Sequence, residues 1–227
     1  IFAANNSKAK IGLPEILVGL FPGAGGTTRL VRKLGAMAAS TYLLEGKTLA
    51  PNKAQAAGII DQVDEDPMKA AREWVLNATE GDLVKPWDQK GYKIPGGPIN
   101  SPKNAQMAVM APTLLFKQAR GLMPQMTAAM DISFQSSYLD IDTMLRVEGR
   151  EFVNIVSGPV AKNMINTFFF QLNKINAGLS RPKDFPKSKV LKLGILGAGM
   201  MGQGIAYVSA KAGIDVVLKD CLLYTSD

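Results

Sequence analysis

The chain has 227 residues, 47% of them hydrophobic, which is enough to bury one large or two small cores. Its formal net charge is +7, but the basic residues are scattered and few aromatic residues lie among them, so nucleic-acid binding is not expected. The chain contains no histidine, so a mechanism that needs an imidazole base cannot be complete within it. Zinc ligands are equally scarce, and we expect no metal site.

Cysteine use and hydropathy narrow the class of protein further. The single cysteine, Cys221, excludes an internal disulfide and fits a reducing compartment. No apolar run is long enough to cross a bilayer, so no transmembrane segment is expected.

The N-terminal part of the chain predicts a mixture of strands and helices. Residues 1–4 resemble the end of a strand, and residues 59–63 suit a short strand or an extended packing segment. Glycine and proline residues at the boundaries predict helices over 36–44, 51–57 and 67–77.

The sharpest local motif is the sequence GLPE at residues 12–15. It leads into an apolar run over residues 16–21 and then into the glycine-rich stretch PGAGGTTRL at residues 22–30. Proline and glycines followed by a threonine and an apolar-periodic segment predict a helix start with exposed amides. Taken alone, Glu15 is typical of a surface carboxylate, because glutamates are seldom buried.

The middle of the chain changes from loop to helix. Residues 78–104 are rich in proline, glycine and polar residues and predict a loop, which Trp87 and Tyr92 should pin to the surface by packing. The methionines that follow, and the run Phe168–Phe170, are expected to lie in a core. Helical periodicity predicts four helices, at 105–119, 123–137, 141–155 and 159–176.

Near the C-terminal end the sequence reads KLGILGAGMMGQGIAYVSAKAGIDVVLKD, residues 192–220. The apolar run at 193–196 predicts a parallel strand buried on both faces. A helix over 200–212 and a second strand over 214–218 follow it, so the segment predicts a β-α-β unit.

Three glycines of this unit make the pattern G-x-G-x-x-G: Gly197, Gly199 and Gly202. Such glycines allow a tight turn, a close approach to a pyrophosphate and close packing of helix on strand. Asp220 follows at the end of the second strand, where a carboxylate suits the ribose 2′-hydroxyl of NAD and repels the 2′-phosphate of NADP. The alternatives are a glycine-rich helix start that binds nothing and a solvated strand-end carboxylate.

The sequence GLPEILVGLFPGAGGTTRL resembles the signature of the crotonase (enoyl-CoA hydratase/isomerase) family, and the likeness continues through EGKTLAPNKAQAAGIIDQV. The resemblance implies that Glu15 is one of two catalytic carboxylates. In that family the other glutamate and the amides of the oxyanion hole come before this motif. The resemblance also implies that four residues line the substrate site: Pro22, Gly23, Gly25 and Gly26.

The order of the motifs resembles one family in particular, the bacterial multifunctional fatty-acid oxidation α-subunit, a fused enoyl-CoA hydratase and 3-hydroxyacyl-CoA dehydrogenase. WDQKGYKIPGG and RPKDFPKSKVLKLGILGAGMMGQGIAYVSAKAGI carry this likeness. In the family, a downstream His–Glu pair oxidises the 3-hydroxyl. The resemblance implies that NAD binds at Gly197, Ala198, Gly199, Met200, Met201, Gly202 and Asp220.

We therefore expect an α/β chain with three parts. Residues 1–77 would be the C-terminal part of a crotonase-like domain, residues 78–186 a loop and helical linker region, and residues 187–220 the first β-α-β of a Rossmann NAD-binding domain. Residues 221–227, CLLYTSD, depart from the family pattern and are expected to be a non-native tail. On this interpretation the chain is a fragment of both active sites, inactive by itself.

The resemblance implies a function in fatty-acid β-oxidation: hydration of 2-enoyl-CoA and oxidation of 3-hydroxyacyl-CoA with NAD. It also implies a bacterial cytoplasmic enzyme with an acyl-CoA substrate, a thiolase subunit as candidate partner and an oligomeric full-length form. Two alternatives stay open, a non-catalytic nucleotide-binding or assembly module and a crotonase-family isomerase joined to a different NAD enzyme.

Overall fold

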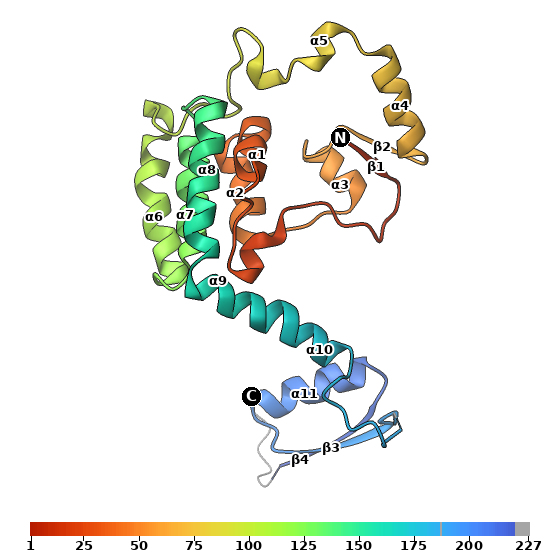
Figure 1. The fold of residues 1–227 in the computed structure, drawn as a ribbon. Helices are drawn as coiled ribbons and strands as arrows, with labels where there is room; N and C mark the ends of the chain where they lie inside the picture. The colour runs from red at the N-terminus through yellow and green to blue at the C-terminus, as the bar shows by residue number, and fades with distance from the viewer. Residues whose placement is uncertain (187, 221–227) are drawn as a thin grey trace. The chain divides into compact units, whose positions relative to one another are not determined.

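A computed structural model describes residues 1–186 and 188–220, and it divides into two compact units. The first unit spans residues 1–177 and the second begins at Gly178. Both mix helices and strands, with helix predominating (Figure 1).

The first unit contains one pair of strands and a series of helices. The strands are β1 (Phe2–Ala4) and β2 (Gln62–Asp64), which pair in parallel with Phe2 opposite Gln62. The short 3-10 helices are η1 (Pro14–Val18), η2 (Pro86–Asp88) and η3 (Pro102–Asn104). The other helices are α1 (Gly26–Leu34), α2 (Ala36–Glu45), α3 (Pro51–Ala56), α4 (Pro67–Asn77), α5 (Glu80–Leu83), α6 (Ala105–Ala119), α7 (Pro124–Gln135), α8 (Ile141–Val156), α9 (Pro159–Met164), the π-helix η4 (Ile165–Gln171) and α10 (Leu172–Asn176).

Local signals place these helices close to where the sequence predicts them. Helix α2 ends at Gly46, whose φ of 63° is left-handed and open to glycine at little cost. Helix α4 begins after Asp66, whose side chain accepts a hydrogen bond from the Lys69 amide. Of the two alternatives for residues 59–63, the structure shows packing at Ile59 and Ile60, which are buried against α1 and α2, and a strand only from Gln62 onward.

Two apolar clusters hold the first unit together. One joins α1, α2 and α3 through buried residues that include Leu30, Val31 and Leu43. The other joins the segment around η1 to the helices α6, α7 and α8, which lie side by side in Figure 1. In it, Ile16 and Phe21 pack with residues of the helical region, namely Leu115, Met126, Ala129, Met130, Ile132 and Met144. The helices after residue 104 therefore share a core with the N-terminal segment.

The core prediction for the methionines and phenylalanines is right in part. Met126, Met130 and Met144 are buried, as expected. The run Phe168–Phe170 is 52–53% exposed, so its assignment to a core is wrong. These phenylalanines lie on the π-helix η4, none of whose residues is buried.

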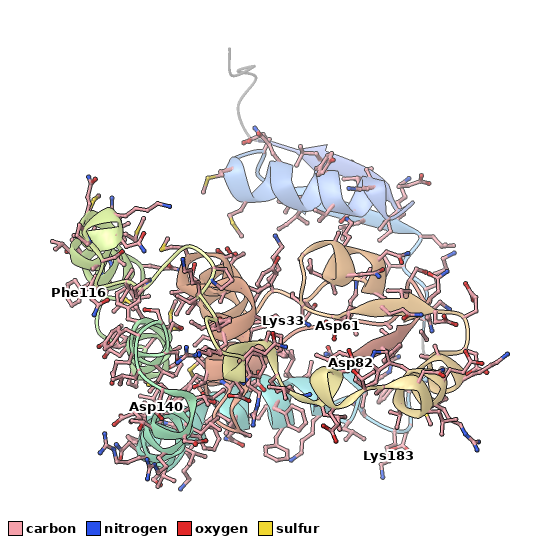
Figure 2. The ribbon with its side chains drawn as sticks, turned by 90° about the horizontal axis from the view of Figure 1, so that it is seen from above. Lys33, Asp61, Asp82, Phe116, Asp140 and Lys183 are labelled. Carbon is pink, nitrogen blue, oxygen red and sulfur yellow. The ribbon has the colours of Figure 1, made fainter. Side chains whose placement is uncertain are left out.

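Two polar contacts pin segments of the first unit in place. The Lys33 ammonium and the Asp61 carboxylate, labelled in Figure 2, form an ion pair at 2.6 Å that ties α1 to the segment before β2. The Tyr92 hydroxyl donates a hydrogen bond to the Arg32 carbonyl, so this loop residue does pin the loop to α1.

The second unit is the predicted β-α-β. It comprises β3 (Lys192–Leu196), α11 (Met200–Lys211) and β4 (Asp215–Lys219), with the strands parallel and Lys192 opposite Asp215. Burial of the first strand on both faces is wrong, because only Ile195 is buried and Leu196 is 86% exposed. Within the described residues the sheet has two strands, and one helix packs on it. Part of the sheet's surface is therefore uncovered.

Within residues 1–186 and 188–220, no helix is long and apolar enough to cross a membrane. The proposed non-native tail, residues 221–227, lies outside the described residues.

The start of α8 offers a test of local helix stability. The Asp140 carboxylate, labelled in Figure 2, accepts a hydrogen bond from the Thr143 amide at 2.8 Å, and this bond lowers the pKa of Asp140. A carboxylate whose folded pKa lies below the unfolded value of about 3.9 stabilises the fold above that pH. The stabilisation is lost as the pH falls through the folded pKa.

We expect Asp140→Ala to lower the midpoint of thermal unfolding near neutral pH and the difference from wild type to shrink in acid. Asp140→Asn keeps a capping oxygen and should retain most of the midpoint. Calorimetry or fluorescence melting across the pH range measures this. Equal midpoints for wild type and Asp140→Ala at neutral pH would show that the cap contributes nothing.

Candidate functional sites

Glu15 lies on the one-turn helix η1. Pro14 starts this turn, and Gly19 ends it with a left-handed φ of 82°. The Leu20 amide donates to the Glu15 carbonyl at 3.1 Å, so the backbone on both sides of Glu15 is fixed. A second constraint comes from α9, because a Cβ on Gly19 would lie 3.0 Å from Met164.

The Glu15 side chain is half-buried and incompletely paired. Its Oε2 atom is buried and has no hydrogen-bond partner among the residues that the structure describes. A buried carboxylate oxygen without a donor is costly, so such atoms in native structures call for an explanation such as a ligand or a catalytic role. The turn therefore presents a positioned acceptor that can take a proton or a hydrogen bond.

The glycine-rich turn after η1 starts helix α1, but its amides are not exposed as the sequence predicts. Gly25 is the N-cap residue, with φ of 86°, and has no side chain with which to cap the helix. The Glu148 carboxylate from α8 takes this role. It accepts hydrogen bonds from the Gly25 amide at 2.7 Å and the Thr28 amide at 2.8 Å.

The same turn packs against α8. A Cβ on Gly23 would lie 2.1 Å from the Phe152 ring, and one on Gly25 would lie 2.9 Å from Leu145. Pro22 and Gly25 are buried, while Gly23 and Gly26 are half-buried. The assignment of these four residues to the substrate site stays a prediction. A cavity of about 1280 Å³ beside α1 is lined by Gly26 but not by Glu15.

Sequence reasoning missed Glu148. It is fully buried, 0% exposed, and lies between two other α8 residues that contact the core. The signal that could have found it is the spacing of Met144, Glu148 and Phe152, four residues apart and hence on one helix face. A carboxylate in the middle of an apolar stripe indicates a buried acceptor.

The second unit carries the glycine turn between β3 and α11. Gly197 is left-handed, with φ of 94°. A Cβ on Gly202 would lie 1.8 Å from the Gly197 carbonyl oxygen, so only glycine lets α11 approach the turn this closely. A Cβ on Gly199 would meet no atom within 4 Å, which leaves room for another molecule beside the backbone.

Asp220 lies against this turn. Its carboxylate accepts a hydrogen bond from the Ala198 amide at 2.6 Å, and the Gly197 amide bonds the Lys219 carbonyl at 2.7 Å. The turn and the end of β4 are thus held together, as a ribose contact beside a pyrophosphate requires. Met200 and Met201 begin α11 and are exposed, and the N-cap residue of this helix, Gly199, has no side chain with which to cap it.

The structure brings the predicted residues together in two groups, one within each unit. Glu15 and the turn over 22–26 belong to the first, while the turn over 197–202 and Asp220 belong to the second. In the described part of the chain, no cluster of three or more His, Cys, Asp or Glu residues could hold a metal ion.

The second unit has the geometry of a dinucleotide-binding protein: a parallel strand, a glycine turn, an uncapped helix start and an acid at the end of the next strand. Comparison with known families agrees. Residues 192–223 match the NAD-binding domain of 3-hydroxyacyl-CoA dehydrogenase. Residues 1–81 match the enoyl-CoA hydratase/isomerase family.

The two matched segments, in this order, match an enoyl-CoA hydratase/3-hydroxyacyl-CoA dehydrogenase fusion. They support enoyl-CoA hydration and NAD-dependent 3-hydroxyacyl-CoA dehydrogenation in fatty-acid oxidation, with an acyl-CoA as substrate and NAD as cofactor. Helices α6 to α10 lie outside both matched segments.

The close packing at Gly202 predicts a large effect of one methyl group. Gly202→Ala should push α11 away from the Gly197 carbonyl and weaken NAD binding, because overpacking of this kind costs about 1–3 kcal/mol. Gly204→Ala is the matched control on the same helix, since its Cβ would meet no atom within 4 Å. Titration of NAD against both variants measures the effect, and equal affinities would mean that the close approach does not matter.

Proposed function

We propose that Glu15 is an acid–base carboxylate of the hydration reaction. Hydration of a 2-enoyl thioester adds a hydroxyl at one carbon of the double bond and a proton at the other, so a group that can give and take a proton must lie beside the substrate. The observation that supports this role is the buried Oε2 of Glu15, which has no partner among the described residues.

In the full-length enzyme, Glu15→Gln should reduce the kcat of hydration by about a hundredfold to ten-thousandfold, because the amide keeps the shape but cannot transfer the proton. Oxidation of 3-hydroxyacyl-CoA by the same polypeptide should stay nearly unchanged. Glu45→Gln, at an exposed glutamate that ends α2, is the control for the substitution itself. Hydratase kinetics that match wild type would make Glu15 structural only.

We also propose that residues 197–202, the glycine turn between β3 and α11, hold NAD. The pyrophosphate would lie at the start of α11 and the adenosine ribose at Asp220. NAD supplies a hydride acceptor for the 3-hydroxyacyl substrate. The chain's own part is to bind and orient the coenzyme. The support is the contact of Asp220 with the Ala198 amide, which places its carboxylate at the turn itself.

Asp220→Ala should weaken NAD binding and reduce the preference for NAD over NADP. A hydrogen bond from a hydroxyl to a carboxylate contributes roughly 1.5–3 kcal/mol, or about one to two decades in affinity. NADP gains in relative terms because the charge that faces its 2′-phosphate is removed. Asp215→Ala, at the exposed start of β4, is the matched control. An unchanged ratio of the two dissociation constants would show that Asp220 does not contact the ribose.

The remaining proposals rest on the family resemblance. We propose that the full-length enzyme is oligomeric, that it works with a thiolase subunit and that it acts in the bacterial cytoplasm. The thiolase proposal has chemical support, since oxidation of a 3-hydroxyacyl thioester yields a 3-ketoacyl thioester, the substrate class of a thiolytic enzyme.

A further inference from the structure

We propose that Glu148 is a positioning residue of the hydration site, which it serves by capping helix α1 from outside the matched hydratase segment. The proposal rests on the role proposed above for Glu15. Glu148 belongs to α8, in the helical region that sequence analysis treats as a linker.

Helix α1 needs a cap that its own sequence does not supply. An N-cap side chain normally accepts a hydrogen bond from the amide of the second or third helical residue. Here the N-cap is Gly25, and the third helical residue is Thr28. The Oε2 atom of Glu148 accepts a hydrogen bond from the Thr28 amide, and its Oε1 atom accepts one from the Gly25 amide. Glu148 lies 120 positions after Thr28, yet it makes the bond that a serine or aspartate at the N-cap would make locally.

Both oxygens of the Glu148 carboxylate accept hydrogen bonds. Its Oε2 also accepts the Thr28 hydroxyl, which in turn accepts a bond from the Ser136 hydroxyl at 3.3 Å. Glu148 is fully buried, and among the described residues it forms no ion pair. The positive end of the α1 dipole and the three donors therefore compensate the buried charge. A buried charge held this way fixes the geometry of its partners closely.

Three further contacts carry the constraint from α8 and α9 toward Glu15. One turn after Glu148, the Phe152 ring meets the Phe21 ring edge-on, with the ring centroids 5.9 Å apart. The Phe152 ring also fills the space beside Gly23. At the other end, Gly19 packs against Ala161 and Met164 of α9.

The whole segment from the Glu15 turn to the start of α1 is therefore clamped by α8 and α9. The hydrogen bonds of Glu148 are the polar part of that clamp. Loss of its charge should let the segment shift while the apolar contacts keep the unit folded.

The test uses Glu148→Gln in the full-length enzyme, because the amide preserves shape and removes the charge and one acceptor. A displacement of a catalytic group by about 1 Å can cost on the order of a hundredfold in rate. We expect the kcat of hydration to fall by about that factor with little change in KM, and the oxidation of 3-hydroxyacyl-CoA to be unaffected. Glu151→Gln, the same substitution one turn further along α8, should behave as wild type in both assays.

A stability control separates positioning from simple loss of structure. Ile99→Ala removes a buried side chain of the same unit from the loop before η3, outside the cluster that contains Ile16 and Phe21. At equal reductions in the unfolding midpoint, Glu148→Gln should lose hydratase kcat and Ile99→Ala should not. Equal loss in the two variants, or an unchanged kcat in Glu148→Gln, would overturn the proposal.

Thr28→Val provides a second variant if Glu148→Gln does not fold. It removes only the hydroxyl donor and should lower hydratase kcat by a smaller factor, while Thr28→Ser keeps the donor and should keep the activity. Failure of the Glu15 proposal has a different signature: Glu15→Gln would then retain hydratase activity whatever the Glu148 variants do.

Discussion

The interaction on which the first unit depends most is the bond between a buried carboxylate and the start of a helix. Gly25 must be glycine, because its backbone is left-handed and Leu145 and Arg29 crowd the place of a Cβ. That choice leaves α1 without a local cap, and Glu148 supplies one from α8. Because the turn needs a glycine at residue 25, helix α1 depends on a carboxylate that lies far away in the sequence. This cap therefore requires α1 and α8 to be packed together.

The same physics appears twice in the chain with opposite outcomes. Helices α1 and α11 both begin after glycines, and both therefore present free amides and a positive dipole end. At α1 a protein carboxylate occupies that end, so the amides stabilise the fold. At α11 the N-cap residue, Gly199, has no side chain, the Asp220 carboxylate bonds the Ala198 amide just before the helix, and the glycines leave room beside the turn for an anion.

The parts that sequence could predict are those decided by neighbouring residues. The bounds of α4 and α6 follow from proline, glycine and apolar periodicity, and the β-α-β unit follows from its glycine pattern. Burial could not be predicted in the same way. Glu148 is buried, while Phe168–Phe170 and Leu196 are exposed, because each outcome depends on which distant surfaces lie opposite. The prediction of exposed amides at residues 22–30 is wrong for the same reason.

Chemical motifs and folding units need not share boundaries. The hydratase match ends at residue 81, yet Ile16, next to Glu15 on η1, and Phe21 after it share a core with helices that begin at residue 105. Without those helices, the two side chains would lose much of the apolar surface that buries them. Helices α6 to α9 therefore pack in the same folding unit as the Glu15 turn. This packing explains why the compact unit continues to residue 177, beyond the end of the hydratase match.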